Sequence, residues 1–97
     1  MKIVPEPIAF DWDTGNINKN WIKHKVSKQE IEEVFRREPL LVYEDMKHSQ
    51  LELRFQALGQ TDEGRKLFLS LTIRGERIRI ISARDMNRKE EVIYEKA

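Results

Sequence analysis

Apolar residues at every second position near residue 70 constrain the fold of this chain more strongly than any other feature. Leu67, Leu69, Leu71 and Ile73 occupy these positions. In an extended strand, alternate residues point to the same face of a sheet, so the pattern predicts a strand with one buried face. We expect the rest of the chain to be organised around this strand.

A tight hairpin is predicted directly after it. Gly75 lies between Arg74 and Glu76, and glycine adopts the positive φ angles that short hairpin turns require. In the next segment, 77–81, arginine alternates with isoleucine, which predicts a second strand with one apolar and one basic face.

The hairpin lies within a strongly basic stretch, residues 65–89, which we call the basic hairpin. It contains eight Lys and Arg residues and two acidic ones, so it carries +6, whereas the whole chain has a formal charge of only +1. Guanidinium groups on a rigid hairpin suit phosphate binding, and we interpret the basic hairpin as the functional surface. A surface of interleaved ion pairs explains the same charges equally well.

Further strands and helices are predicted on both sides of the basic hairpin. Short strands are expected at residues 8–12, 40–43 and 51–58, and helices at about 17–25, after the Ser27–Glu30 capping box, and over 86–96. The first helix is expected to start near Asn16 as its cap and to bury the face that carries Ile17, Trp21 and His24. In the second, the stripe Ile31, Val34 and Phe35 is expected to be buried.

This order predicts a small α+β fold and one domain over residues 1–97: an N-terminal strand, two helices, a four-stranded antiparallel meander and a C-terminal helix. The chain contains no Cys and two His residues, which excludes disulfides and thiolate chemistry and disfavours a structural zinc site. We expect no metal and no cofactor. No apolar run approaches the roughly 18 residues of a membrane span, so we expect no membrane contact and a cytoplasmic location.

The side chains include those that RNA cleavage requires. In metal-free cleavage the ribose 2′-OH attacks the neighbouring phosphorus, while a base, an acid and cations assist. His24 and His48 are candidate proton carriers, and Glu52 lies two residues before Arg54. Each has a structural alternative: His24 packs against the sheet, His48 lies in a surface loop, and Glu52 pairs with Arg54.

Arg84 breaks the strand pattern. By parity it shares a face with Ile78 and Ile80, where an apolar residue is expected. Either the strand ends or bulges after Ile81, or Arg84 is partly buried and paired. A residue that departs from its local pattern is a functional candidate.

Several motifs together resemble the BrnT family of bacterial toxins, over about residues 8–95. The most specific is Arg74-Gly75-x-x-Ile78-Arg79-Ile80-Ile81-Ser82-Ala83-Arg84. The others, in order, are Phe10-Asp11-Trp12-Asp13, Asn16-x-x-Lys19-Asn20, Lys23-His24, Val26-Ser27, the E-x-V-F of Glu32 to Phe35, Asp45-x-x-His48-Ser49-x-x-Glu52-x-Arg54, Gly59-x-Thr61-x-x-Gly64-Arg65 and Glu91-x-x-Tyr94-Glu95.

The resemblance implies a type II toxin with a RelE-like fold, a metal-independent endoribonuclease that cleaves RNA and blocks translation. It also implies a BrnA-type antitoxin, assembled with the toxin as a 2:2 heterotetramer that contacts operator DNA only through the antitoxin. Our hypothesis is that Arg54, Arg79 and Arg84 hold the phosphate, that His24 or His48 moves a proton, and that Glu52 is an orienting residue or an alternative base. Residues expected to bind RNA are Lys19, Lys23, Arg65, Arg74, Arg77, Arg88 and Tyr94, the last of which is equally compatible with the core.

This sequence departs from the family pattern at two positions. The family usually has Gly where Lys25 stands, ending the first helix in a left-handed conformation. Either the helix ends differently here, or Lys25 bears a strain of roughly 1 kcal/mol. Lys28 replaces a frequent aromatic residue, which loosens helix packing or alters the antitoxin surface.

Two other functions stay open at this point. The basic hairpin could form a non-catalytic nucleic-acid-binding module, or a partner-binding module whose arginines pair with an acidic subunit. Sequence-tolerant binding of single strands uses exposed aromatic residues for base stacking, and the basic hairpin has only Phe68. This observation favours phosphate chemistry.

Overall fold

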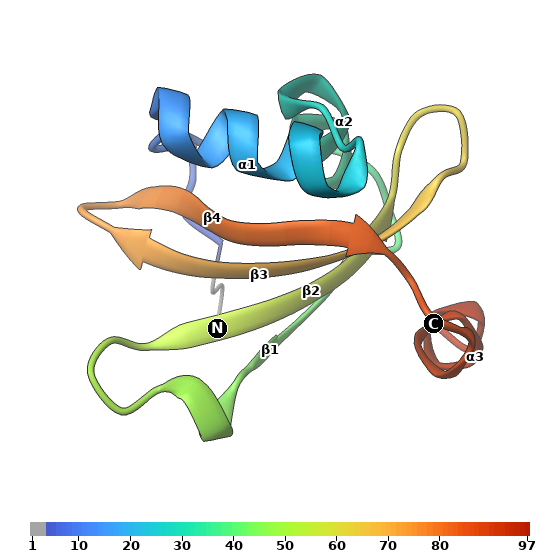
Figure 1. Cartoon of the computed structure of the whole chain (residues 1–97). Coiled ribbons are helices and arrows are strands. Elements are labelled where there is room, and N and C mark those ends of the chain that lie inside the picture. The colour runs from blue at the N-terminus through green and yellow to red at the C-terminus, as the bar shows by residue number, and fades with distance from the viewer. Residues whose placement is uncertain (1–3) are drawn as a thin grey trace.

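The computed structural model describes residues 4–97, which form a four-stranded antiparallel sheet with helices on both faces (Figure 1). The strands follow one another in the sheet in chain order, as the predicted meander requires. The elements in sequence are α1 (Thr14–His24), α2 (Lys28–Val34), β1 (Leu41–Glu44), the 3-10 helix η1 (Met46–His48), β2 (Arg54–Gln60), β3 (Lys66–Arg74), β4 (Arg77–Asp85) and α3 (Arg88–Glu95).

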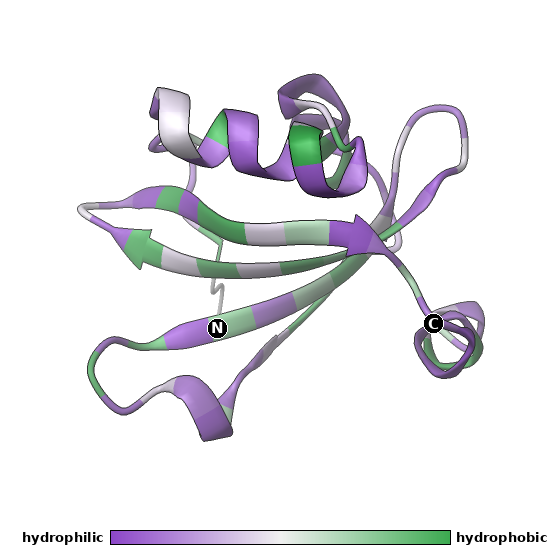
Figure 2. Cartoon of the chain, viewed as in Figure 1, coloured by the Kyte–Doolittle hydropathy of each residue, from purple (hydrophilic) through white to green (hydrophobic). Residues whose placement is uncertain are grey.

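The central strand β3 is buried as predicted. Leu67, Leu69 and Leu71 have no exposed surface, and together with Ile78 and Ile80 of β4 they form the floor of the core. Figure 2 shows hydrophobic and hydrophilic residues alternating along β3 and β4. Burying a leucine side chain contributes about 1.5–3 kcal/mol, so this row stabilises the fold strongly.

The hairpin between β3 and β4 has the predicted turn. Arg74 pairs with Arg77, and Gly75 and Glu76 between them both have positive φ angles, 53° and 68°. Two successive positive φ angles are typical of the type I′ turn, whose twist matches that of the strands.

The helix α2 packs on the face of the sheet that carries the core. Its capping box joins Ser27 and Glu30, and Ile31, Val34 and Phe35 are buried, all as predicted. The helix passes very close to β2, because a Cβ on Gly59 would lie 2.5 Å from Cγ1 of Val34. Glycine at position 59 therefore permits the close packing of α2 on the sheet.

The helix α1 lies along the free edge of β4 (Figure 1) and does not face the core as predicted. Trp21 is 50% exposed, whereas Asn16 and Asn20 are buried. Asn20 accepts a hydrogen bond from the backbone N–H of Ala83 at 3.0 Å and donates one to the carbonyl of Asn16 at 2.9 Å. The buried face is polar because it satisfies the backbone of an edge strand.

The N-terminal end of α1 also differs from the prediction. The cap is Asp13, and Asn16 is the third helical residue of the capping box. Residues 8–12 form no strand; a single parallel bridge joins Phe10 to Ile78, with hydrogen bonds of 2.8 Å at Asp11 and Ala9. The chain turns into the helix cap immediately after this bridge, which leaves no length for a ladder.

A β-bulge in β4 explains the unusual position of Arg84. The register shifts so that Ser82 lies opposite Ser70 while Ile80 lies opposite Leu71, leaving Ile81 as an extra residue. The extra residue reverses the parity of the strand, so Ala83 enters the core and Arg84 faces the other side. Of the alternatives from the sequence, the bulge is confirmed, and Arg84 is also partly buried and paired.

Candidate active site

The loop between β1 and β2 is a compact unit closed at its base. The backbone N–H of Asp45 donates to the carbonyl of Arg54 at 2.8 Å. The Ser49 hydroxyl lies inside the loop, donating to the Asp45 carbonyl at 2.6 Å and accepting from the Arg54 N–H at 3.0 Å. The motif Asp45-x-x-His48-Ser49-x-x-Glu52-x-Arg54 is therefore one folded element.

His48 is held against Asp45 within this loop. Its ring Nδ1 lies 2.9 Å from Oδ2 of Asp45, and its backbone N–H donates to Oδ1 at 3.3 Å. Gln56, from β2, also donates to Oδ2 at 3.3 Å. Burial acts to raise the pKa of Asp45, but these bonds, from His48 above all, outweigh it and hold the pKa below its usual value.

An open hollow of about 520 Å³ lies beside this loop. Within it, Glu52 and Arg74 form an ion pair of 3.3 Å. Within residues 4–97, no acceptor takes a hydrogen bond from the half-buried guanidinium of Arg54. The hollow thus contains an imidazole, a carboxylate and a cation without a counterion; its lining is Lys47, His48, Gln50, Leu51, Glu52, Arg54 and Arg74.

Arg79 lies in the same row of the sheet as Arg54. Both residues are paired with Thr72 of β3, on either side of it. The guanidinium of Arg79 points to the start of α1, at 2.6 Å from Asp13 and 3.7 Å from Asp11. The backbone hydrogen bond from Asn16 and the contact with Arg79 lower the pKa of Asp13. Arg79 therefore links the start of α1 to the sheet near the hollow.

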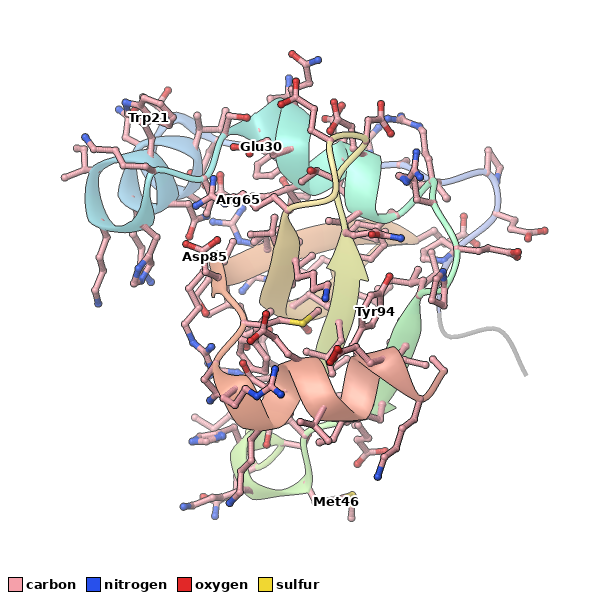
Figure 3. All side chains as sticks on the ribbon, turned by 90° about the vertical axis from the view of Figure 1, so that its right-hand side faces the viewer. Trp21, Glu30, Met46, Arg65, Asp85 and Tyr94 are labelled. Atoms are coloured by element: carbon pink, nitrogen blue, oxygen red, sulfur yellow. The ribbon has the colours of Figure 1, made fainter. Side chains whose placement is uncertain are left out.

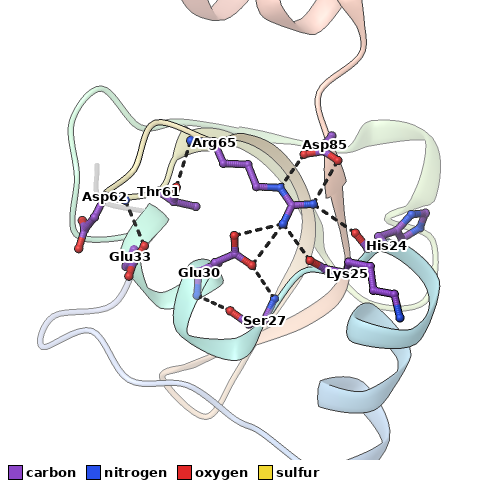
Figure 4. A network of polar contacts seen from close by, with 9 residues as sticks. All are labelled: His24, Lys25, Ser27, Glu30, Glu33, Thr61, Asp62, Arg65 and Asp85. Atoms are coloured by element: carbon purple, nitrogen blue, oxygen red, sulfur yellow. Dashed lines mark hydrogen bonds and ion pairs between the residues drawn. The ribbon is translucent and has the colours of Figure 1, made fainter.

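The opposite end of the sheet holds a different arrangement, centred on Arg65 (Figure 4). The guanidinium of Arg65 donates to both oxygens of Asp85 at 2.7 and 3.1 Å and to Glu30 at 3.1 Å. It also donates to the carbonyls of His24 and Lys25 at 3.2 and 2.8 Å. All five of its N–H groups are thus engaged. Figure 3 shows Arg65 between Glu30 and Asp85, and Met46, in η1, at the opposite edge of the molecule.

Arg84 and Tyr94 fasten α3 to this same end. Arg84 forms two hydrogen bonds with Glu90, of 2.8 and 2.9 Å, and lies 4.1 Å above the Phe68 ring. Tyr94 is buried, and its hydroxyl donates to the carbonyl of Pro39 at 2.6 Å. Both polar groups therefore bind within the fold.

The remaining predicted residues are spread over the surface. Lys19 donates to the carbonyl of the bulged Ile81 at 3.2 Å. His24 is half-buried at the end of α1 and does not line the hollow. In the described part of the chain, no side-chain partner is found for Lys23, Arg77 or Arg88, which are exposed.

The structure therefore brings together only some of the predicted residues, namely His48, Glu52, Arg54 and Arg74, with Arg79 nearby. It places His24, Arg65, Arg84 and Tyr94 elsewhere. Sequence reasoning missed Asp45, although the Asp-x-x-His spacing was visible and is typical of a turn that places the two side chains together.

Imidazole, carboxylate and guanidinium groups around one hollow of a small α+β domain are the side chains that a small ribonuclease uses. A family model described as "Ribonuclease toxin, BrnT, of type II toxin-antitoxin system" matches residues 12–90. The chain belongs to this BrnT family of ribonuclease toxins, which implies an antitoxin partner. No curated protein matches the chain.

Among residues 4–97, no group of three or more His, Asp and Glu side chains is arranged to hold a metal ion. No helix in this part of the chain has the length and apolar character to cross a membrane.

Proposed function

We propose that this chain is the toxin of a type II pair and cleaves RNA endonucleolytically in the hollow, without a metal, so that translation stops. The observation that carries the proposal is the guanidinium of Arg54, which has no acceptor in the described fold and lies beside His48 and Glu52. A half-buried cation without a counterion favours an anion, and the RNA backbone supplies a phosphate at every nucleotide.

The chemistry assigns one step to each side chain. The Glu52 carboxylate takes the proton from the 2′-OH, and the 2′ oxygen forms a bond to phosphorus. The bond from phosphorus to the 5′ oxygen breaks, and His48 gives a proton from Nε2 to that leaving oxygen. Arg54 stabilises the charge on the phosphorane. The products carry a 2′,3′-cyclic phosphate and a 5′-hydroxyl.

Other predicted residues take different places in this proposal. Arg77, Lys23 and Arg88 are exposed, and they bind RNA backbone outside the cleavage point. Arg74 lines the hollow beside Glu52 and binds the RNA backbone there. Arg65, Arg79, Arg84 and Tyr94 are omitted from the site, because their polar groups already bind within the fold.

The proposed partner is a BrnA-type antitoxin that neutralises the toxin in a 2:2 heterotetramer and contacts operator DNA on behalf of the complex. Family membership supports an antitoxin in general. The type of antitoxin, the stoichiometry and the DNA contact belong to the proposal.

The test is incubation of the purified chain with a long unstructured RNA in EDTA, beside the His48→Ala and Arg54→Ala variants and the control Arg36→Ala, an exposed arginine outside the proposed site. We expect cleavage with cyclic phosphate ends by the parent and by Arg36→Ala, and none by the other two. Cleavage by both His48→Ala and Arg54→Ala would refute the assignment of the site. Intact RNA in every lane, also with translating ribosomes added, would favour the non-catalytic binding module.

A further inference from the structure

The contact between Asp45 and His48 fixes more than the position of the loop. An imidazole has two ring nitrogens, and a neutral ring carries its proton on only one of them. A carboxylate only accepts hydrogen bonds, so the nitrogen facing Asp45 must carry a proton. That nitrogen is Nδ1, at 2.9 Å from Oδ2.

The Asp45 carboxylate is itself firmly placed. Its side chain is only 9% exposed, whereas that of His48 is 56% exposed. Three donors fix it: the His48 ring, the His48 backbone N–H and the Gln56 amide. Because Gln56 belongs to β2, the carboxylate is anchored to the sheet and does not simply follow the loop.

From this geometry we propose that Asp45 is a positioning residue that keeps Nδ1 of His48 protonated, so that proton transfer occurs only at Nε2. In the imidazolium that acts as the acid both nitrogens carry a proton; Asp45 retains the one on Nδ1, and the one on Nε2 goes to the leaving 5′ oxygen. This inference rests on the proposed role of His48 in RNA cleavage. Within the described fold no group binds Nε2, which leaves that nitrogen to the substrate in the hollow. Without Asp45, the imidazolium can lose the Nδ1 proton instead, and the neutral ring that remains is too weak an acid to give up the proton on Nε2.

The sharpest test is the Asp45→Asn variant, which keeps the size of the side chain and an oxygen to accept from the His48 backbone N–H. Its amide nitrogen then replaces Oδ2, faces Nδ1 and donates to it, which moves the ring proton to Nε2; the Gln56 amide turns to offer its oxygen to the same nitrogen. Asp45→Ala removes both oxygens and should leave the His48 ring in a mixture of forms like that of His24, whose ring forms no hydrogen bond in the described fold. Asp62→Asn is the matched control, an exposed Asp that contacts Arg37 at 3.6 Å.

The first measurement is ¹⁵N NMR of the two imidazoles at a pH where they are neutral. We expect the Nδ1-protonated form for His48 in the parent and in Asp62→Asn, and the Nε2-protonated form in Asp45→Asn. An unchanged His48 spectrum in both Asp45 variants would overturn the inference. This readout needs no activity, so it stands even if the parent fails to cleave RNA and the proposed function falls.

The second measurement is cleavage of a short fluorescent RNA, with melting curves to confirm that each variant is folded. We expect kcat to fall about 10- to 100-fold in Asp45→Asn, with KM changed less than about twofold, because only a proton-transfer step is impaired. A change of tautomer with an unchanged kcat would show that Asp45 positions no group that acts in catalysis.

Discussion

The two ends of the sheet each hold a partly buried arginine, but in opposite states. Arg65 lies at the end where β3 begins and β4 finishes, and all five of its N–H groups are bonded. Arg54 lies at the end that carries the hollow and has no acceptor within residues 4–97. The two side chains are chemically identical. In the described fold, however, Arg65 has no N–H group left for a ligand, whereas all five N–H groups of Arg54 are available.

The difference lies in what surrounds each guanidinium. Around Arg65, two helix-terminal carbonyls, Glu30 and Asp85 converge from three elements, and the bond to Asp85 raises the pKa of Arg65 well above its usual value. Near Arg54, the carboxylate that lines the hollow within residues 4–97 is that of Glu52, and it is bonded to Arg74 instead. We infer that the first end stabilises the fold, whereas the second is kept available for phosphate.

Truncating the free arginine should give the largest effect. For Arg54→Ala we expect RNA cleavage to fall about 10²–10³-fold, the usual cost of losing one group that stabilises transition-state charge. The free energy of unfolding should change by less than about 1 kcal/mol, because no bond within the fold is lost. Cleavage rates and urea unfolding measure the two effects. A variant that loses stability but cleaves RNA normally would contradict the comparison.

Truncating the saturated arginine should give the reverse result. Arg65→Met leaves Glu30, Asp85 and two carbonyls without their donor, and we expect a loss of about 2–3 kcal/mol, below the value for a fully buried pair because the Arg65 side chain is 27% exposed. Cleavage per folded molecule should be unchanged at a temperature where the variant is folded. Arg88→Met, at an exposed position with no partner in the described fold, is the control for stability and should leave the free energy of unfolding unchanged.

Acid should weaken the Arg65 end of the molecule. The hydrogen bond from Arg65 lowers the pKa of Asp85 from its usual 3.8. Burial acts to raise the pKa of Glu30, but bonds from Ser27 and Arg65 outweigh it and lower the pKa from its usual 4.5. A carboxyl whose pKa is depressed by folding stabilises the fold above its usual pKa and loses that contribution as the pH falls through its folded value.

We therefore expect the parent to lose stability below about pH 4, and Arg65→Met to lose less over the same range. Urea midpoints at a series of pH values measure this difference. Identical pH dependence in the two proteins would show that Arg65 does not set the pKa values of these carboxyls.

Much of the fold could be predicted because it depends on local patterns. The alternating leucines, the glycine turn and the Ser27–Glu30 box each specify a backbone conformation within a few residues. The orientation of α1 does not follow from such patterns. Asn20 is buried because its amide binds the edge of β4, 63 residues away in the chain. Hydrophobic periodicity predicts Trp21 as the buried residue instead, because it does not register such a distant polar contact.

The site was harder to predict for a related reason. Counting charges locates cations but does not show which of them are neutralised by distant carboxylates. Arg65, Arg79 and Arg84 of the basic hairpin all have acidic partners, whereas Arg54 lies outside that stretch. The Asp45–His48 pair could have been predicted, since both residues lie in one short motif, but hydrophobic patterns and charge counts did not single out Asp45.

The smallest expected effect concerns Lys25, which adjoins the Arg65 end. Lys25 caps α1 with φ 54° and ψ 39°. This is the left-handed conformation that glycine usually adopts at the end of a helix. Lys25→Gly should relieve a strain of about 1 kcal/mol but lose the contact of the ammonium group with Trp21, at 5.3 Å, which contributes about 0.5 kcal/mol. A net gain of about 0.5 kcal/mol in unfolding free energy is expected, with cleavage unchanged.

The Lys25→Ala variant separates the strain from the Trp21 contact. It loses the Trp21 contact and retains the strain, so it should be less stable than the parent. If the two variants were equally stable, the left-handed strain would be absent, and the carbonyl bonds from Arg65 would alone determine how α1 ends.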